Sequence, residues 1–196
     1  MRCAAVGWLS HRPSGARRKG TACALSGQTC PQWALWQAPP VALENQGPPF
    51  PTVAACILDS YARRVGRELL HRSGDLLDDA KRLLAYEAIV LSHDAGVDPR
   101  FVYANSAAAS LWRMSIEDMI GMPSRLSAPV DARDDRAQML SDASRDGVLS
   151  GYSGERVASD GTRFQIMDAT LWTVDGYSSG PGQAVVFSRW EPIDDV

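Results

Sequence analysis

Cysteine is scarce in this chain and poorly placed for the chemistry it usually supports. The four cysteines are Cys3, Cys23, Cys30 and Cys56, so none follows residue 56. No two of them have the C-x-x-C spacing of a zinc site or a thioredoxin-like redox motif. A secreted disulfide framework is not supported either, because the main part of the chain would hold only one cysteine. We therefore expect a cytoplasmic protein.

Long apolar runs and N-terminal acids are also missing. No run approaches the roughly 20 apolar residues that span a bilayer, so we expect no membrane association. Residues 1–43 contain no acid, only Arg2, Arg12, Arg17, Arg18 and Lys19 as charged residues. All 23 acidic residues therefore lie in 44–196 and make that part net acidic. Because nucleic-acid binding needs a basic face, we expect no direct nucleic-acid role.

The N-terminal segment, residues 1–51, has low complexity. It is rich in Gly, Pro, Ser and Arg, and it ends in the proline-rich stretch 46–51. Its basic, acid-free composition would suit a transit peptide, but prolines and glycines interrupt any amphipathic helix. We expect a disordered tail, or translated sequence upstream of the natural start.

Two amphipathic helices are predicted next, over 53–70 and 75–85. In the first, Ile57, Leu58 and Tyr61 share one face, and Gly66 is expected to weaken the helix without ending it. In the second, Ser73 can act as the cap. The apolar stripes predict packing either on a sheet or on a second copy of the chain.

The remaining elements alternate between strand and helix patterns. Strands are predicted over 88–93, 101–104, 152–159, 162–174 and 183–190. Helical segments are predicted over 105–112, within 114–129 and over 132–146. The Asp160–Gly161 dipeptide favours a tight hairpin turn. The prediction is an α+β fold, a five-stranded antiparallel sheet with helices on one face, in a domain spanning 53–192.

Several separate segments resemble one family. They are ILDSY (57–61), LSH (91–93), FVYANSAA (101–108), PSRLSA (123–128), Y-S-G-x-R (152–156), GTRFQI-x-DATLW (161–172) and Trp190. With the strand order, they resemble the PAS-like MEKHLA domain, found as a small bacterial protein and at the C-terminus of plant homeodomain–leucine zipper factors. The DNA-binding and zipper parts have no counterpart here. The resemblance implies a PAS-like fold and a sensory or protein-interaction role, and it supplies no catalytic residues.

His93 and Asp168 are the polar candidates for a site. His93 ends the first strand, near the mouth of a PAS-type cavity, where it would bind a ligand or haem iron or serve as a hydrogen-bonded structural residue. Strand alternation over 162–174 places Asp168 on the inward face. There it would anchor a ligand or form a proton-transfer pair with His93. Alternatively, Asp168 binds backbone N–H groups, or a bulge turns it outward.

The other candidates are an amide and four aromatic residues. Asn105 is expected to cap the 105–112 helix and, secondarily, to contact a ligand. Four aromatic residues are candidates either for a flat cavity or for the core: Tyr103, Trp112, Phe164 and Trp172. Flavin photosensors of the PAS class use a cysteine in the helical region, and this domain has none there, so photochemical adduct formation is not expected.

Three functions follow from these patterns. The first is a sensory module that binds a small molecule and passes the signal to an unidentified partner protein. The second is an interaction module that forms a homodimer through helix 53–70. The third is a small lyase or isomerase using His93 and Asp168. No glycine-rich phosphate loop, H-E-x-x-H helix or G-x-S-x-G elbow is present, so we expect no enzyme, and the sequence names no cofactor.

Overall fold

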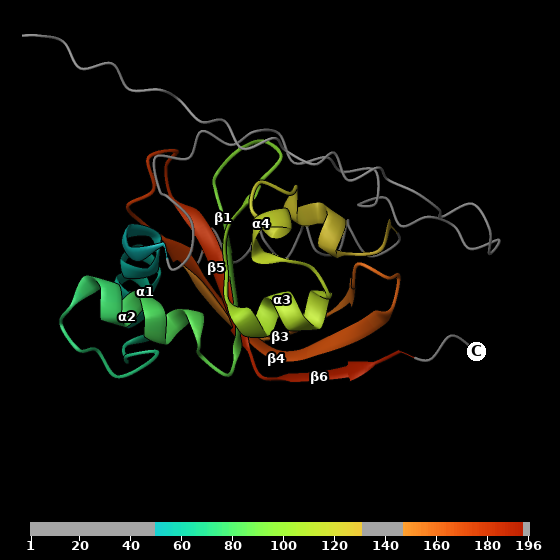
Figure 1. Ribbon diagram of the computed structural model, residues 1–196, viewed down its shortest axis with the longest axis horizontal. Coiled ribbons are helices and arrows are strands. Elements are labelled where there is room, and N and C mark those ends of the chain that lie inside the picture. The colour runs from blue at the N-terminus through green and yellow to red at the C-terminus, as the bar shows by residue number, and fades with distance from the viewer. Residues whose placement is uncertain (1–49, 131–146, 194–196) are drawn as a thin grey trace, which may run out of the picture. The chain divides into compact units, whose positions relative to one another are not determined.

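The computed structural model describes residues 50–130 and 147–193, which form an antiparallel sheet with helices (Figure 1). The helices are α1 (Pro51–Val65), α2 (Leu76–Leu84), α3 (Ser106–Trp112), α4 (Ile116–Met119) and the short 3₁₀ helix η2 (Ser124–Ser127). The strands are β1 (Ile89–His93), β2 (Phe101–Ala104), β3 (Val148–Val157), β4 (Arg163–Val174), β5 (Gly182–Phe187) and β6 (Arg189–Pro192). The helix predicted over 132–146 and nearly all of the predicted tail lie outside the described residues.

The described strands pair only in antiparallel fashion, in the order β2-β1-β5-β4-β3, with β6 paired to β4. The α+β prediction and its antiparallel sheet are therefore confirmed. The predicted strand 183–190 is in fact two strands. β5 pairs with β1 and with residues 170–174 of β4, whereas β6 pairs with residues 164–167. This adds a sixth strand to the five predicted.

A bulge in β4 explains that division. Asp168 has φ 52°, in the left-handed region that a non-glycine residue rarely adopts, and the register with β3 shifts nearby. Phe164 and Ile166 face one core before the bulge, and Trp172 and Val174 face the other core after it. Simple alternation across Asp168 was therefore the wrong assumption, and the outward bulge is the alternative that holds.

The sheet has a buried core on each face. Helices α3 and α4 cover one face, where Trp112 and Met119 pack with Leu91 and Phe187. Helices α1 and α2 cover the other, as Figure 1 shows on either side of β1 and β5. There the Tyr61 ring meets Trp172 edge-on, with centroids 4.9 Å apart. The apolar stripe of α1 therefore packs on the chain's own sheet, which decides between the two predicted alternatives.

Local chemistry fixes the helix ends. Pro51 occupies the first turn of α1, where a missing N–H costs nothing. Gly66 adopts φ 78° and caps the helix through its N–H to the carbonyl of Ala62. The prediction that α1 continues through Gly66 to residue 70 was therefore wrong. Helix α2 is capped by Asp75, not by Ser73, because the Asp75 carboxylate accepts the N–H of Asp78.

Candidate ligand-binding site

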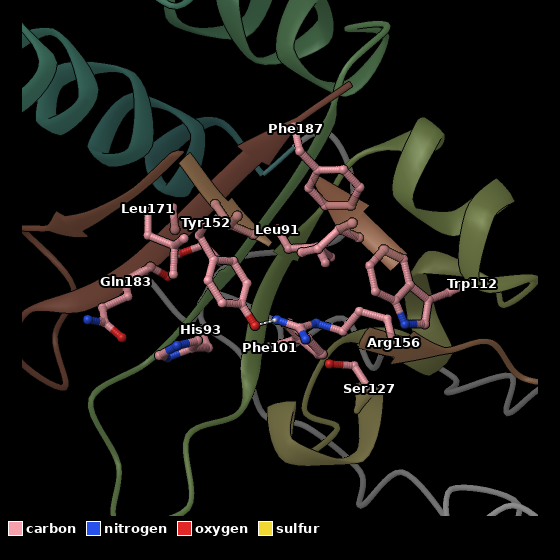
Figure 2. A pocket seen from close by; sticks show the side chains of 14 residues that line it. Leu91, His93, Phe101, Trp112, Ser127, Tyr152, Arg156, Leu171, Gln183 and Phe187 are labelled. Carbon is pink, nitrogen blue, oxygen red and sulfur yellow. Dashed lines mark hydrogen bonds between the residues drawn. The ribbon is translucent and has the colours of Figure 1, made fainter. Parts of the chain in front are cut away.

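A small cavity of about 30 Å³ lies between the sheet and the helices α3 and η2. Apolar side chains make up most of its wall, including Leu91, Phe101, Trp112, Leu171 and Phe187 (Figure 2). A cavity needs about 10–15 Å³ to hold one water molecule. The space as it stands therefore accepts about two water molecules or a group of similar size, not a flavin or a haem.

Arg156 brings a cation to this wall. It lies on β3 and only 7% of it is exposed. One terminal N–H group donates to the Glu155 carbonyl at 2.7 Å, and the other donates to the Tyr152 hydroxyl at 3.2 Å. Figure 2 shows the guanidinium beside that hydroxyl, among the apolar side chains. Among the described residues that line the cavity none is acidic, so this part of the lining carries a positive charge.

Tyr152 reaches Arg156 across a glycine. Tyr152, Gly154 and Arg156 follow one another at alternate positions of β3, so they share a face of the strand. A Cβ atom on Gly154 would overlap the phenol of Tyr152. The missing side chain therefore lets the Tyr152 ring lie along the strand, and the guanidinium carbon of Arg156 sits 5.5 Å from the ring centroid.

The indole of Trp112 forms another part of the wall. Its ring meets Phe164 edge-on at 5.1 Å and Phe187 at 6.3 Å between centroids. The indole N–H is buried and has no hydrogen-bond acceptor within the described part of the chain. Because an indole N–H can only donate, this atom adds an unused donor to a wall that already carries a cation.

His93 and Ser92 approach the cavity from the end of β1. The His93 ring donates from Nδ1 to the Asp94 carbonyl at 2.8 Å. The Ser92 hydroxyl donates to the Gln183 carbonyl at 2.8 Å, so the hydrogen bond of 2.7 Å to Tyr177 must come from the tyrosine O–H. Burial raises the pKa of Tyr177 above its usual range, which keeps that proton in place. The Ser92 hydroxyl is thus already engaged on both sides.

Comparison with models of protein families tests the family resemblance that was seen in separate segments of the sequence. The model of the MEKHLA domain matches residues 51–192, from the start of α1 to the end of β6. This chain belongs to the MEKHLA domain family. A comparison with curated proteins gives no significant match.

Solved structures similar to this MEKHLA domain are PAS and light-oxygen-voltage domains. A PAS domain from Colwellia psychrerythraea shares 17% identity at a TM-score of 0.47, covering 57% of this chain and 95% of that chain. A PAS domain from a two-component sensor histidine kinase shares 11% at 0.45, covering 58% and 91%. An RNA-binding light-oxygen-voltage receptor shares 16% at 0.49, covering 62% and 35%. These distant likenesses transfer no ligand to this chain.

The structure brings only some of the predicted site residues together. His93 and Trp112 line the cavity, and Phe164 packs behind Trp112. Tyr103 and Trp172 lie in the core on the opposite face of the sheet, where burial raises the pKa of Tyr103 above its usual range. These two aromatic residues therefore do not contribute to the cavity of this MEKHLA domain.

Asn105 and Asp168 also lie away from the cavity. Asn105 is fully buried as the N-cap of α3, as predicted, but it has no place in the cavity wall. The side chain of Asp168 is 62% exposed and pairs with Arg189. His93 pairs with Gln183 of β5, and Gln183 pairs on its other side with Thr173 of β4. Thr173 is five residues, or roughly 16 Å along the strand, from Asp168. The predicted His93–Asp168 pair does not form.

Sequence reasoning missed the cation and its neighbour. Arg156 and Tyr152 were quoted only as part of the family resemblance, and charged residues are usually exposed. The signal was the alternation Tyr-x-Gly-x-Arg on one strand, which places a phenol and a guanidinium on the same face of the sheet. Within the described ranges, no helix is long and apolar enough to cross a membrane, and no three metal-ligand side chains cluster.

Proposed function

We propose that this MEKHLA domain is a sensory module that binds a small molecule in the cavity beside α3 and passes the signal to a partner protein. The observation that carries the proposal is a small, mostly apolar cavity whose wall includes a buried cation and an N–H donor that has no acceptor among the described residues. Few convergent polar groups in an apolar setting are typical of ligand sites. The PAS-like family of the chain supports a sensory role.

Catalysis is not part of the proposal. The acid–base pair predicted for a lyase or isomerase required His93 and Asp168 to share a ligand. Asp168 faces away and is paired with Arg189, so the predicted His93–Asp168 pair is not available for acid–base chemistry. A fold alone confers no chemistry, and the described cavity wall offers recognition groups instead.

Signal output through a protein contact is the second half of the proposal. A homodimer through helix 53–70 would have to use the outer, polar face of α1, with Asp59, Arg63 and Arg64, because its apolar residues are buried against the sheet. Sedimentation velocity of the full chain over a wide concentration range tests this contact. A monomer at every concentration would remove the dimer and leave a different partner protein as the recipient.

Two neighbouring residues of β5 give a matched test of the cavity. Val185 lines the cavity, whereas Val186 packs against the core on the opposite face. Val185→Phe should fill the cavity, and Val186→Phe should add the same bulk elsewhere. Overpacking costs about 1–3 kcal/mol in either place, so the two variants should be comparably stable.

The measurement is a thermal-shift screen of small molecules on the full chain, followed by calorimetric titration and native mass spectrometry of the compounds that bind. We expect compounds that raise the melting temperature of the wild type and of Val186→Phe but not of Val185→Phe. A screen in which no compound binds, or in which Val185→Phe binds as well as the wild type, would refute ligand sensing through this cavity.

A further inference from the structure

We propose that the cavity of this MEKHLA domain binds the carboxylate of a short organic acid, held by Arg156 and by the indole N–H of Trp112. The proposal rests on the proposed ligand-sensing function and specifies its ligand class. It follows from the donors on the wall, the charge they carry and the size of the space.

The first step is the charge balance of Arg156. The residue is more than nine-tenths buried, and the hydrogen-bond partners of its guanidinium are a backbone carbonyl and a phenol, both neutral. By contrast, Arg72, Arg113 and Arg189 are all more exposed, and each pairs with a carboxylate. Burying a charge without a counter-ion is costly. Within the described part of the chain, the least exposed of these four arginines is thus the one without a carboxylate partner.

The second step is the chemistry of the remaining polar atoms. The guanidinium has five N–H donors, and only part of them is used. Trp112 lines the same cavity, and its indole N–H is a buried donor without an acceptor among the described residues. A ligand that satisfies both groups must accept hydrogen bonds and carry negative charge. Arginine binds planar carboxylates through two parallel hydrogen bonds.

The third step is size and polarity. A space of about 30 Å³ accepts a carboxylate group in place of about two water molecules. Much of the remaining described wall is apolar, with Leu91, Leu171 and Phe187, and suits a short hydrocarbon tail instead of a second charge. A longer acid would have to displace Tyr152, whose half-buried ring lies along β3 over Gly154. The fit therefore favours acids of acetate or propionate size.

The test titrates the full chain with sodium propionate by calorimetry, at constant ionic strength. Propionamide serves as the neutral analogue, and nitrate and phosphate serve as inorganic anions. Arg156→Met removes the charge and keeps an extended apolar side chain, whereas Arg156→Lys keeps the charge and removes the paired donors. Trp112→Phe removes the indole N–H. Arg189→Met is the matched control, since Arg189 lies on β6 away from the cavity.

We expect propionate to bind the wild type and Arg189→Met with equal affinity. We expect Arg156→Met and Arg156→Lys to weaken that binding at least about tenfold, as for a lost charged hydrogen bond, and Trp112→Phe to weaken it less. Without added anions, Arg156→Met should melt at or above the wild-type temperature, because it removes an uncompensated buried charge. A purely structural role for Arg156 would instead lower the melting temperature and leave propionate binding unchanged.

Several results would overturn the proposal. Propionamide binding as tightly as propionate would show that charge is irrelevant, and retained affinity in both Arg156 variants would show that Arg156 is not the anchor. Equal binding of nitrate or phosphate would make this a general anion site. If neutral compounds bind the wild type but not Val185→Phe, and propionate does not bind, the carboxylate assignment fails while ligand sensing stands. If no compound of any class binds, both fail.

Discussion

Asn105 connects two elements through one buried side chain, and removing that side chain should cost far more than a helix cap. Its Oδ1 accepts the N–H of Ala108 at 3.0 Å and the N–H of Val90 at 3.1 Å. Its Nδ2 donates to the carbonyls of Tyr86 at 3.0 Å and Ala88 at 2.7 Å. The side chain thus starts α3 and extends the β1–β2 ladder by one residue.

The magnitude follows from these four bonds. Losing an N-cap costs about 1 kcal/mol, and a buried N–H left without an acceptor costs about 1–3 kcal/mol more. With the two carbonyls partly rehydrated, Asn105→Ala should lower the free energy of unfolding by roughly 3–5 kcal/mol. Asn105→Asp keeps the acceptor oxygen but sets a second oxygen against two carbonyls, so it should be no more stable than the alanine variant.

Urea unfolding of the full chain, followed by circular dichroism, measures these differences. Ser115→Ala is the matched control, because Ser115 caps α4 at the surface and its side chain hydrogen-bonds with Asp118 of the same helix. It should cost about 1 kcal/mol or less. The reasoning is refuted if Asn105→Ala costs no more than Ser115→Ala, or if Asn105→Asp is as stable as the wild type.

Three further outcomes are expected. The Arg72 guanidinium and the backbone N–H of Ser73 hold the pKa of Asp79 at about 2. The contribution of the Asp79 carboxylate to stability should therefore be complete at neutral pH and decline as the pH falls from about 4 to 2. The urea midpoints of Asp79→Asn should lack that decline. Ile57→Ala should lower the free energy of unfolding by about 2–5 kcal/mol, since this α1 side chain is fully buried; a urea-measured loss under 1 kcal/mol would contradict the packing on the sheet. Gly182→Ala should lower the melting temperature, because a Cβ there would overlap the His93 carbonyl; an unchanged value would contradict the close approach of β5 to β1.

Local sequence chemistry predicted much of the fold. The Asn105 cap, the small-residue helix after it and the strands β1, β2 and β4 depend on nearest neighbours and appear where they were expected. The strand predicted over 152–159 instead runs from Val148 to Val157, and the one predicted over 183–190 is divided into β5 and β6. Gly66 was misjudged because glycine either interrupts or ends a helix, and tertiary packing of the following residues decides which. The family was also within reach, since its matching segments run through most of the domain.

The site was harder to predict because two strands change face within their length. Simple alternation fails at the Asp168 bulge and again in β2, where Phe101 and Tyr103 face different cores beside a register shift. Bulges leave almost no signature in a single sequence. Charged residues are usually exposed, and for that reason the burial of Arg156 was not predicted. Its burial depends on the helices above the sheet.

The single layer of strands between the two cores would let the proposed ligand affect the opposite face of the sheet. Leu171 borders the cavity, and the next residue, Trp172, meets Tyr61 of α1 on the far side. Leu171 and Trp172 are consecutive residues of one strand, so a ligand that displaces the Leu171 side chain must also tilt Trp172. Helix α1 would register that tilt without ever touching the occupant, and its outward face, with Arg63 and Arg64 bound to Asp175, is where another protein would sense the change.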